Sequence, residues 1–346
     1  MMLENVKALK RYVLSAPDRV NALRVNTAET VVINGFWRSG TTWLQELVAE
    51  GLNAKRVFEP LQARCGYIQK AVQGIALPDP GYAYINGFMP YATTAHTPSP
   101  AMKALLHQAQ KGILTNPFVL RDQALLDPGR AFKNRVVVKY VKGALSLKYL
   151  KDTYQCPVIH IYRDPRAVIS SIKARKNWAE GAFENFSLTN HLLNVNDGRA
   201  DYFSRFSDDI RAIDKAGDFE RLTGYYFLTE KFIEDSFGGD SLHYVRFEEL
   251  ARNPDLEFQK IAGYLNCDDI IVPDFKKPSS TAYVPDSTKK METSKVTSGW
   301  AGKLGEAQLQ TIEDIAAKFA MTPRLTGLAG EKNTSEQSTR EYAESK

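Results

Sequence analysis

The sequence predicts an α/β fold in which a central parallel β-sheet is flanked by helices. Short runs rich in β-branched residues alternate with helix-like segments, as in chains that form parallel sheets. These runs are apolar on both faces, which is typical of strands that helices cover from either side. The length of 346 residues suffices for one large domain with a sizeable core. We expect residues 1–330 to form that single domain.

The predicted elements can be placed in order along the chain. Strands are predicted at residues 31–33, 135–139, 157–162 and 242–247. Each is followed by a predicted helix, at residues 41–51, 145–153, 165–176 and 248–265. Pro165 stands at the start of the third helix, where its missing N–H costs little.

Two insertions and a tail interrupt this alternation. Residues 66–130 contain the aromatic-rich sequence GYAYINGFMPYATTAHTPSP and a helical segment near residues 102–114. Residues 179–235 are rich in helical patterns. Because long insertions in a compact domain are commonly functional, we predict that both bind a substrate. Residues 331–346 are polar and lack an apolar stripe, which predicts a disordered tail.

Composition narrows the class of protein. The hydrophobic content of 43% and charged content of 25% are ordinary for a globular protein. The net charge of +5 suits a small anionic ligand but is too low to indicate a nucleic-acid partner. Three widely spaced cysteines favour a reducing compartment. With no signal-peptide pattern and no long apolar run, we expect a cytoplasmic protein without a membrane anchor.

The first predicted strand leads into the turn of NGFWRSGTTWL. Gly35 and Gly40 have the spacing of a phosphate-binding loop, which predicts a P-loop-like nucleotide-binding fold. The loop N–H groups and the helix dipole favour an anion there. Thr41 replaces the usual lysine, and Arg38 lies inside the loop instead. The loop therefore suits a 5′-linked group of lower charge than a triphosphate with Mg²⁺.

A second motif, VIHIYRDPRAVISSI, spans residues 158–172. Arg163 follows the strand, and Ser171 lies two helical turns further on. The carboxyl edge of a parallel sheet is where such folds bind ligands, so we expect both residues to share one anion with the first loop. A turn held by an Arg–Asp pair, with no ligand, is the simpler alternative.

Together the two motifs resemble the signatures of the sulfotransferases that use 3′-phosphoadenosine 5′-phosphosulfate (PAPS). The segment similar to FWRSGTTWL binds the 5′-phosphosulfate in that family. The resemblance assigns that role here to Arg38, Ser39, Gly40, Thr41 and Thr42, and adenine stacking to Trp43. The segment that resembles YRDPRAVISS holds the 3′-phosphate, which implies this role for Arg163 and Ser171.

Further blocks extend the resemblance toward the carbohydrate and tyrosyl-protein branch of the family. Family members of the Golgi carry a membrane anchor, and since we expect none here, the resemblance implies a bacterial-type soluble enzyme. These blocks are VFEPL at 57–61, VVVKYVKGALSLKYL at 136–150, HYVRFEELARNP at 243–254 and SKVTSGW at 294–300. In the last block, Lys295 and Ser298 would contact the 3′-phosphate. The resemblance also implies adenosine 3′,5′-bisphosphate (PAP) as product and no metal requirement.

The resemblance implies catalytic residues as well. Lys139 matches a lysine on the middle strand, but Val141 stands where the cytosolic phenol and steroid branch has its histidine. Glu59 occupies the place of a glutamate in the carbohydrate and tyrosyl-protein branch. Burial in a partly dry cleft can raise a carboxyl pKa enough for general-base catalysis. We therefore predict that Glu59 removes the acceptor proton while Arg38 and Lys139 stabilise developing charge.

Several questions stay open at this point. His96 or His107 of the first insertion could serve as the base instead. A P-loop kinase or nucleotide hydrolase, or a non-catalytic nucleotide-binding protein of the same fold, are the alternative functions. The acceptor is expected to be a small molecule or a carbohydrate. Its identity, the choice between oxygen and nitrogen, and the oligomeric state cannot be derived from the residues.

Overall fold

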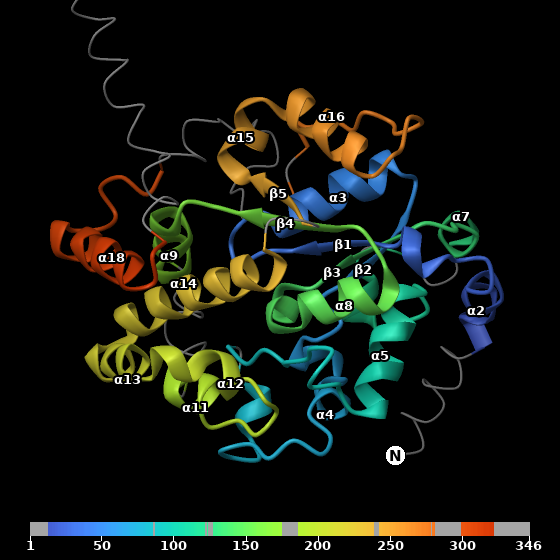
Figure 1. Cartoon of the computed structure of the whole chain (residues 1–346). Helices are drawn as coiled ribbons and strands as arrows, with labels where there is room; N and C mark the ends of the chain where they lie inside the picture. Colours follow the sequence, from blue (N-terminus) through green and yellow to red (C-terminus); the bar gives the residue numbers. More distant parts are fainter. Residues whose placement is uncertain are drawn as a thin grey trace, which may run out of the picture.

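The computed structural model describes residues 13–85, 87–121, 123, 127–174, 186–238, 242–277, 279–280 and 299–321. These residues contain a parallel sheet of order β2–β3–β1–β4–β5 (Figure 1). Its strands are β1 (Val31–Asn34), β2 (Lys55–Phe58), β3 (Val136–Lys139), β4 (Val158–Tyr162) and β5 (His243–Arg246). The predicted α/β class, with helices flanking a central parallel sheet, is confirmed.

Helices cover both faces of this sheet (Figure 1). The described α-helices are α2 (Ala16–Asn21), α3 (Thr41–Gly51), α4 (Ile68–Ala71), α5 (Pro100–Gln110), α6 (Pro117–Leu120), α7 (Pro128–Ala131), α8 (Leu147–Tyr154), α9 (Pro165–Lys173), α11 (Leu188–Leu192), α12 (Ala200–Phe203), α13 (Ser207–Ala216), α14 (Asp218–Phe237), α15 (Phe247–Arg252), α16 (Pro254–Tyr264) and α18 (Glu306–Lys318). The 3₁₀ helices are η1 (Thr27–Glu29), η2 (Ala63–Cys65), η3 (Tyr82–Tyr84), η4 (Val141–Ser146) and η5 (Ser204–Phe206). None of the described helices is long and apolar enough to cross a bilayer.

Alternating strand side chains supply two cores, one on each face of the sheet. Val31 and Ile33 pack in one core with residues of α3, α15 and α16. Val32 points the other way and packs with residues of α5, α8 and α14. All four residues of β1 are buried, as expected for the central strand of a covered parallel sheet.

Strand β2 was not among the strands predicted from the sequence. Its sequence, KRVF, begins with two charged residues, yet Lys55 is fully buried. The Nζ atom of Lys55 lies 3.6 Å from Oδ1 of Asp18 on α2, and Arg130 of α7 contacts the same carboxylate. Partners distant in sequence therefore make a charged residue acceptable inside the sheet.

The predicted helix 248–265 is two helices. Asn253 separates α15 from α16 and has φ −129° and ψ 63°. A residue before proline is pushed out of the helical region, and Pro254 has no N–H to continue the helix. Lys295, Ser298 and the predicted tail 331–346 lie outside the described residues.

Candidate active site

The turn between β1 and α3 is tightly enclosed at the carboxyl edge of the sheet. A Cβ atom on Gly35 would lie 2.3 Å from the carbonyl oxygen of Ile161. A Cβ atom on Gly40 would lie 2.4 Å from the ring of Phe247, and its φ of 91° is one that L side chains rarely adopt. Both glycines are therefore needed to fit the loop between β4 and α15.

Arg38 joins this loop to the segment between β4 and α9. Its Nε atom donates a 3.0 Å hydrogen bond to Oγ of Ser171. In the opposite direction, Nη1 of Arg163 donates a 3.0 Å hydrogen bond to the carbonyl oxygen of Arg38. Arg38 has φ 67°, a conformation that a non-glycine residue keeps only where its surroundings hold it. The structure thus brings the two sequence motifs together.

Helices α14 and α15 hold Arg163 through residues to which the sequence assigned no role. The ring centre of Phe247 lies 4.4 Å from the guanidinium carbon of Arg163. Oε1 of buried Glu248 accepts a 3.1 Å hydrogen bond from the N–H of Asp164, and the hydroxyl of Tyr226 donates a 2.7 Å bond to the carbonyl of Arg163. The sequence could have indicated this role, because Phe247 and Glu248 stand at the end of a predicted parallel strand, and all parallel strands end at the same edge of the sheet.

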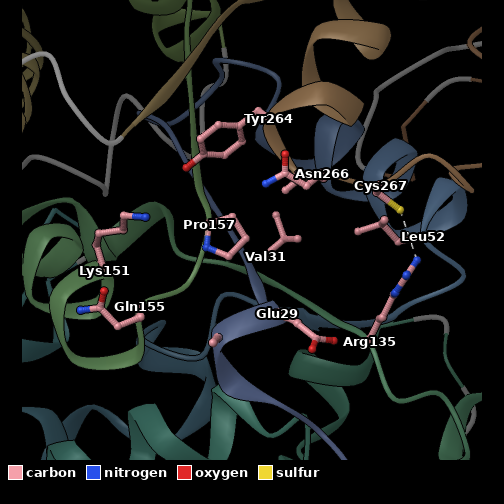
Figure 2. A pocket seen from close by; sticks show the side chains of 12 residues that line it. Glu29, Val31, Leu52, Arg135, Lys151, Gln155, Pro157, Tyr264, Asn266 and Cys267 are labelled. Atoms are coloured by element: carbon pink, nitrogen blue, oxygen red, sulfur yellow. Dashed lines mark hydrogen bonds between the residues drawn. The ribbon is translucent and has the colours of Figure 1, made fainter.

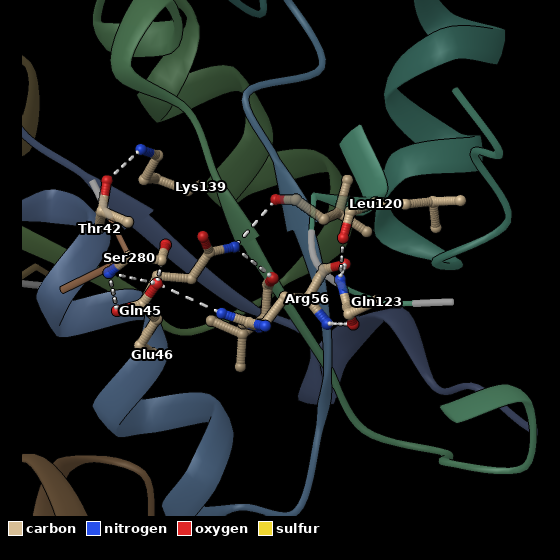
Figure 3. A network of polar contacts seen from close by, with 10 residues as sticks. Thr42, Gln45, Glu46, Arg56, Leu120, Gln123, Lys139 and Ser280 are labelled. Atoms are coloured by element: carbon tan, nitrogen blue, oxygen red, sulfur yellow. Dashed lines mark hydrogen bonds and ion pairs between the residues drawn. The ribbon is translucent and has the colours of Figure 1, made fainter. Parts of the chain in front are cut away.

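Lys139, at the end of β3, connects Glu59 to the phosphate loop. Its Nζ atom lies 2.7 Å from Oε1 of Glu59. The same atom donates a 2.8 Å hydrogen bond to Oγ1 of Thr42 (Figure 3). The same atom lies 3.7 Å from the ring centre of Phe58. The Lys139 side chain is 2% exposed and that of Glu59 is 12% exposed. One buried ammonium therefore bridges the predicted base and the first turn of α3.

Electrostatics around Glu59 differ from the expectation based on burial alone. Burial raises the pKa of Glu59, but the charge and hydrogen bond of Lys139, the hydrogen bond of Gln62 and the charge of Lys142 outweigh it and leave the pKa below its ordinary value. Burial lowers the pKa of Lys139, although Glu59 opposes this. Burial also lowers the pKa of Lys142 to about 8. Glu59 is accordingly a carboxylate at neutral pH, and it is less basic than predicted.

Ser39 and Trp43, which are both predicted to bind the donor, are both buried. The Ser39 side chain is fully buried, and its Oγ atom has no hydrogen-bond partner among the described residues. Buried hydroxyls are normally paired, so this atom fits a loop that accepts an anion. Trp43 is 5% exposed and meets the ring of Phe247 edge-on, with 6.0 Å between ring centres. Its expected stacking on adenine stays a prediction.

Comparison with known proteins identifies the family. The profile described as the sulfotransferase domain matches residues 28–316. This chain belongs to the sulfotransferase family. The family recognised from the two binding motifs is thereby confirmed, and the P-loop-like sheet is the fold of this family. No curated protein sequence matches the chain.

Solved structures of sulfotransferase domains resemble the chain at low identity. The domain from the curacin biosynthetic pathway is 14% identical, with a TM-score of 0.42, and the match covers 84% of this chain and 97% of that one. The domain from the Synechococcus PCC 7002 olefin synthase is 16% identical (TM-score 0.39, 84% and 94% covered). The sulfotransferase from Alicyclobacillus acidocaldarius is 17% identical (TM-score 0.39, 86% and 94% covered).

The histidines of this sulfotransferase family member have other partners. Nε2 of His96 lies 2.9 Å from Oδ2 of Asp201. His107 stacks on Tyr154, which ends α8 on the way back to the amino edge of the sheet. In the described part of the chain neither histidine contacts Glu59. His160 is fully buried and forms hydrogen bonds with Asn34 and Glu230.

The aromatic stretch of the first insertion is mostly internal. Phe88 and Tyr91 are buried, whereas Tyr84 is exposed. Three carbonyl oxygens of this stretch accept hydrogen bonds from buried side chains of other elements. Gly87 accepts from Tyr225 of α14, Met89 from Arg199, which precedes α12, and Pro90 from Ser146 of η4. The backbone of this segment is therefore held in place by several elements.

A cavity of about 400 Å³ lies at the opposite edge of the sheet (Figure 2). Its lining includes Val31, Arg135 and Pro157, which lie at or just before the starts of β1, β3 and β4. No residue predicted for the active site lines it. This cavity is therefore separate from the carboxyl edge, where the sequence motifs meet.

Proposed function

We propose that this sulfotransferase family member transfers the sulfuryl group of PAPS directly to a hydroxyl or an amine of a small-molecule or carbohydrate acceptor, releasing PAP. The observation that supports this proposal is the junction of Arg38, Arg163 and Ser171, because two motifs that lie this close could bind one ligand together. The bound PAPS supplies an activated sulfuryl group and a leaving phosphate.

The residues present fit such a donor. The loop offers N–H groups at the start of α3, the unpaired hydroxyl of Ser39 and the guanidinium of Arg38. Arg163 and Ser171 offer a cation and a hydroxyl on the β4 side. Hydrogen bonds from charged donors to phosphate oxygens are the strong kind. We propose that Ser171 accepts from Arg38 in the free protein and donates to the 3′-phosphate in the complex.

We propose Glu59 as the group that takes the acceptor proton. It is ionised at neutral pH, and its two oxygens are held by Lys139 and Gln62, which fixes the direction of the carboxylate. Lys139 also touches Thr42 of the loop, so an anion bound there competes with Glu59 for the same ammonium. As Lys139 turns toward that anion, the pKa of Glu59 rises and the carboxylate becomes a better base.

A cytoplasmic location is part of the same proposal. Cys65, Cys156 and Cys267 are free thiols, and all three are buried. Free thiols are typical of proteins that work in a reducing compartment.

The decisive experiment follows radiolabelled sulfate from PAPS into a panel of phenol, amine and sugar acceptors. Glu59→Gln should abolish transfer while PAP affinity, measured by calorimetry, stays within a few-fold. PAP binding without transfer to any acceptor would favour a non-catalytic nucleotide-binding protein. Preference for Mg²⁺–ATP over PAP would favour a kinase or hydrolase. Transfer that survives Glu59→Gln would remove Glu59 as the base.

A further inference from the structure

Arg121 occupies an unusual position beside the proposed base. It follows α6 with φ 57° and ψ −121°. A hydrogen bond of 3.1 Å from the N–H of Gln123 to the carbonyl of Leu120 closes the turn around it. These angles are those of the first central residue of a type II′ turn, where glycine is favoured because other residues are strained. An arginine is therefore kept where the backbone alone would favour glycine.

The turn that carries Arg121 is fixed to the edge strand β2. Gln123 pairs with Arg56 much as a neighbouring strand would, accepting from its N–H at 2.9 Å and donating to its carbonyl at 2.9 Å (Figure 3). Nε2 of Gln123 also donates to the carbonyl of Leu120 at 2.9 Å. These contacts hold the Arg121 backbone at a defined place next to the end of β2.

The guanidinium of Arg121 stacks on an aromatic ring, and its N–H donors have no hydrogen-bond partner among the residues that the structure describes. Its carbon lies 4.0 Å from the ring centre of Phe58, the residue before Glu59. Nζ of Lys139 lies 3.7 Å from the same ring centre, so both cations share one aromatic side chain. Arg121 is exposed, and its side chain makes no hydrogen bond or ion pair with the described residues.

Charges around Glu59 do not balance among the residues that the structure describes. Lys139 is paired with Glu59, and Arg56 is paired with Glu46. Arg121 has no such partner. Lys142, also buried near Glu59, makes one long hydrogen bond of 3.4 Å to a backbone carbonyl. The region therefore carries surplus positive charge next to the carboxylate that is proposed to activate the acceptor.

Topology separates this region from the donor site. The proposed donor residues follow β1 and β4, whereas Glu59 follows β2 and Arg121 packs on Phe58 of β2, on the other side of β3. A molecule that touches both Glu59 and Arg121 is therefore the acceptor. We propose that Arg121 binds an oxyanion of the acceptor, a carboxylate or an existing sulfate ester, next to the group to be sulfated. This inference rests on the proposed function.

The test compares matched probes that differ in charge. Binding of 4-hydroxybenzoate, 4-hydroxybenzenesulfonate and neutral 4-hydroxybenzamide is measured by calorimetry on the PAP-saturated protein, together with 4-nitrophenyl glucuronide and the matching glucoside. The wild type should prefer anionic probes by about tenfold or more, as expected for a charge-assisted contact. The carboxylate and sulfonate arms distinguish the two kinds of oxyanion. Added salt should reduce the preference.

Arg121→Gly is the informative variant, because glycine suits the turn. It should lower the anionic preference to about twofold or less, while Arg121→Lys should keep part of it. The control is Arg205→Ala, which removes an arginine of η5 that stacks at 4.0 Å on Tyr202 of α12. The proposal is overturned if the anionic preference survives Arg121→Gly. It is also overturned if the wild type binds charged and neutral probes equally, or binds neither. Because these readouts need no turnover, failed sulfate transfer would contradict the proposed function separately.

Discussion

Replacing Lys139 by methionine tests the buried bridge at the end of β3. The variant keeps the length of the side chain over Phe58 but removes the ammonium from Glu59 and Thr42. Removing one member of a buried ion pair costs about 3–5 kcal/mol. Glu59 keeps the hydrogen bond from Gln62 and the attraction of Lys142, so we expect the lower end, about 3 kcal/mol. In a domain of this size that lowers Tm by roughly 6–9 °C.

The pH dependence of this loss identifies its cause. In the wild type the pKa of Glu59 is below its ordinary value, so its contribution to stability is present above the unfolded-state pKa and is lost as pH falls through the folded-state pKa. Without Lys139, burial dominates and raises the pKa of Glu59. Stability of the variant should then be highest where Glu59 is protonated and should fall as pH rises through the new pKa.

Urea unfolding at several pH values measures both effects. We expect the penalty of Lys139→Met to shrink toward acidic pH, and Glu59→Gln in the same chain to restore at least half of it. Lys148→Met, which breaks a half-exposed pair with Asp152, should cost no more than about 0.5 kcal/mol. A loss below about 1 kcal/mol at neutral pH, or a loss that is independent of pH and of Glu59, would refute the reasoning.

Three other changes test the remaining contacts. Arg163→Ala should weaken PAP binding by about 1.5–3 kcal/mol and leave adenosine 5′-phosphate binding nearly unchanged; equal weakening of both ligands in calorimetry would contradict the 3′-phosphate role. Gly40→Ala should destabilise the fold by about 2–4 kcal/mol in chemical unfolding, because its Cβ would meet Phe247 at 2.4 Å with φ at 91°; a neutral result would show that the loop can relax. Burial raises the pKa of Glu248, so wild-type stability should fall as pH rises through that pKa. Glu248→Gln should flatten this part of the pH–stability curve. An unchanged curve would exclude Glu248 as the source of the pH dependence.

The sequence predicted the elements that carry strong local signals. Helix α3 has the predicted bounds because Gly40 fixes its start. Strand β2 was omitted because Lys55 is tolerated inside only through Asp18 and Arg130, which lie far away in sequence. The division between α15 and α16 was available from Pro254 and was missed.

The candidate site shows the same division between local and distant information. The phosphate loop and the Arg163–Ser171 spacing were visible as motifs. The stacking of Phe247 under Arg163 and the hydrogen bond from Asp164 to Glu248 depend on strands that meet only in the folded sheet. The pKa of Glu59 was expected to rise because burial can be guessed from sequence, whereas a 2.7 Å distance to Lys139 cannot.

The contact between Arg38 and Ser171 affects how donor affinity should be understood. The Ser171 hydroxyl accepts from Arg38 and still has its own O–H, so it can donate to a phosphate without breaking this contact. The same contact holds two chain segments in register before a nucleotide arrives, which reduces the ordering entropy that binding must overcome. Ser171→Ala should therefore weaken nucleotide binding in two ways, because it removes an O–H donor to the phosphate and also the contact that orders the two segments beforehand.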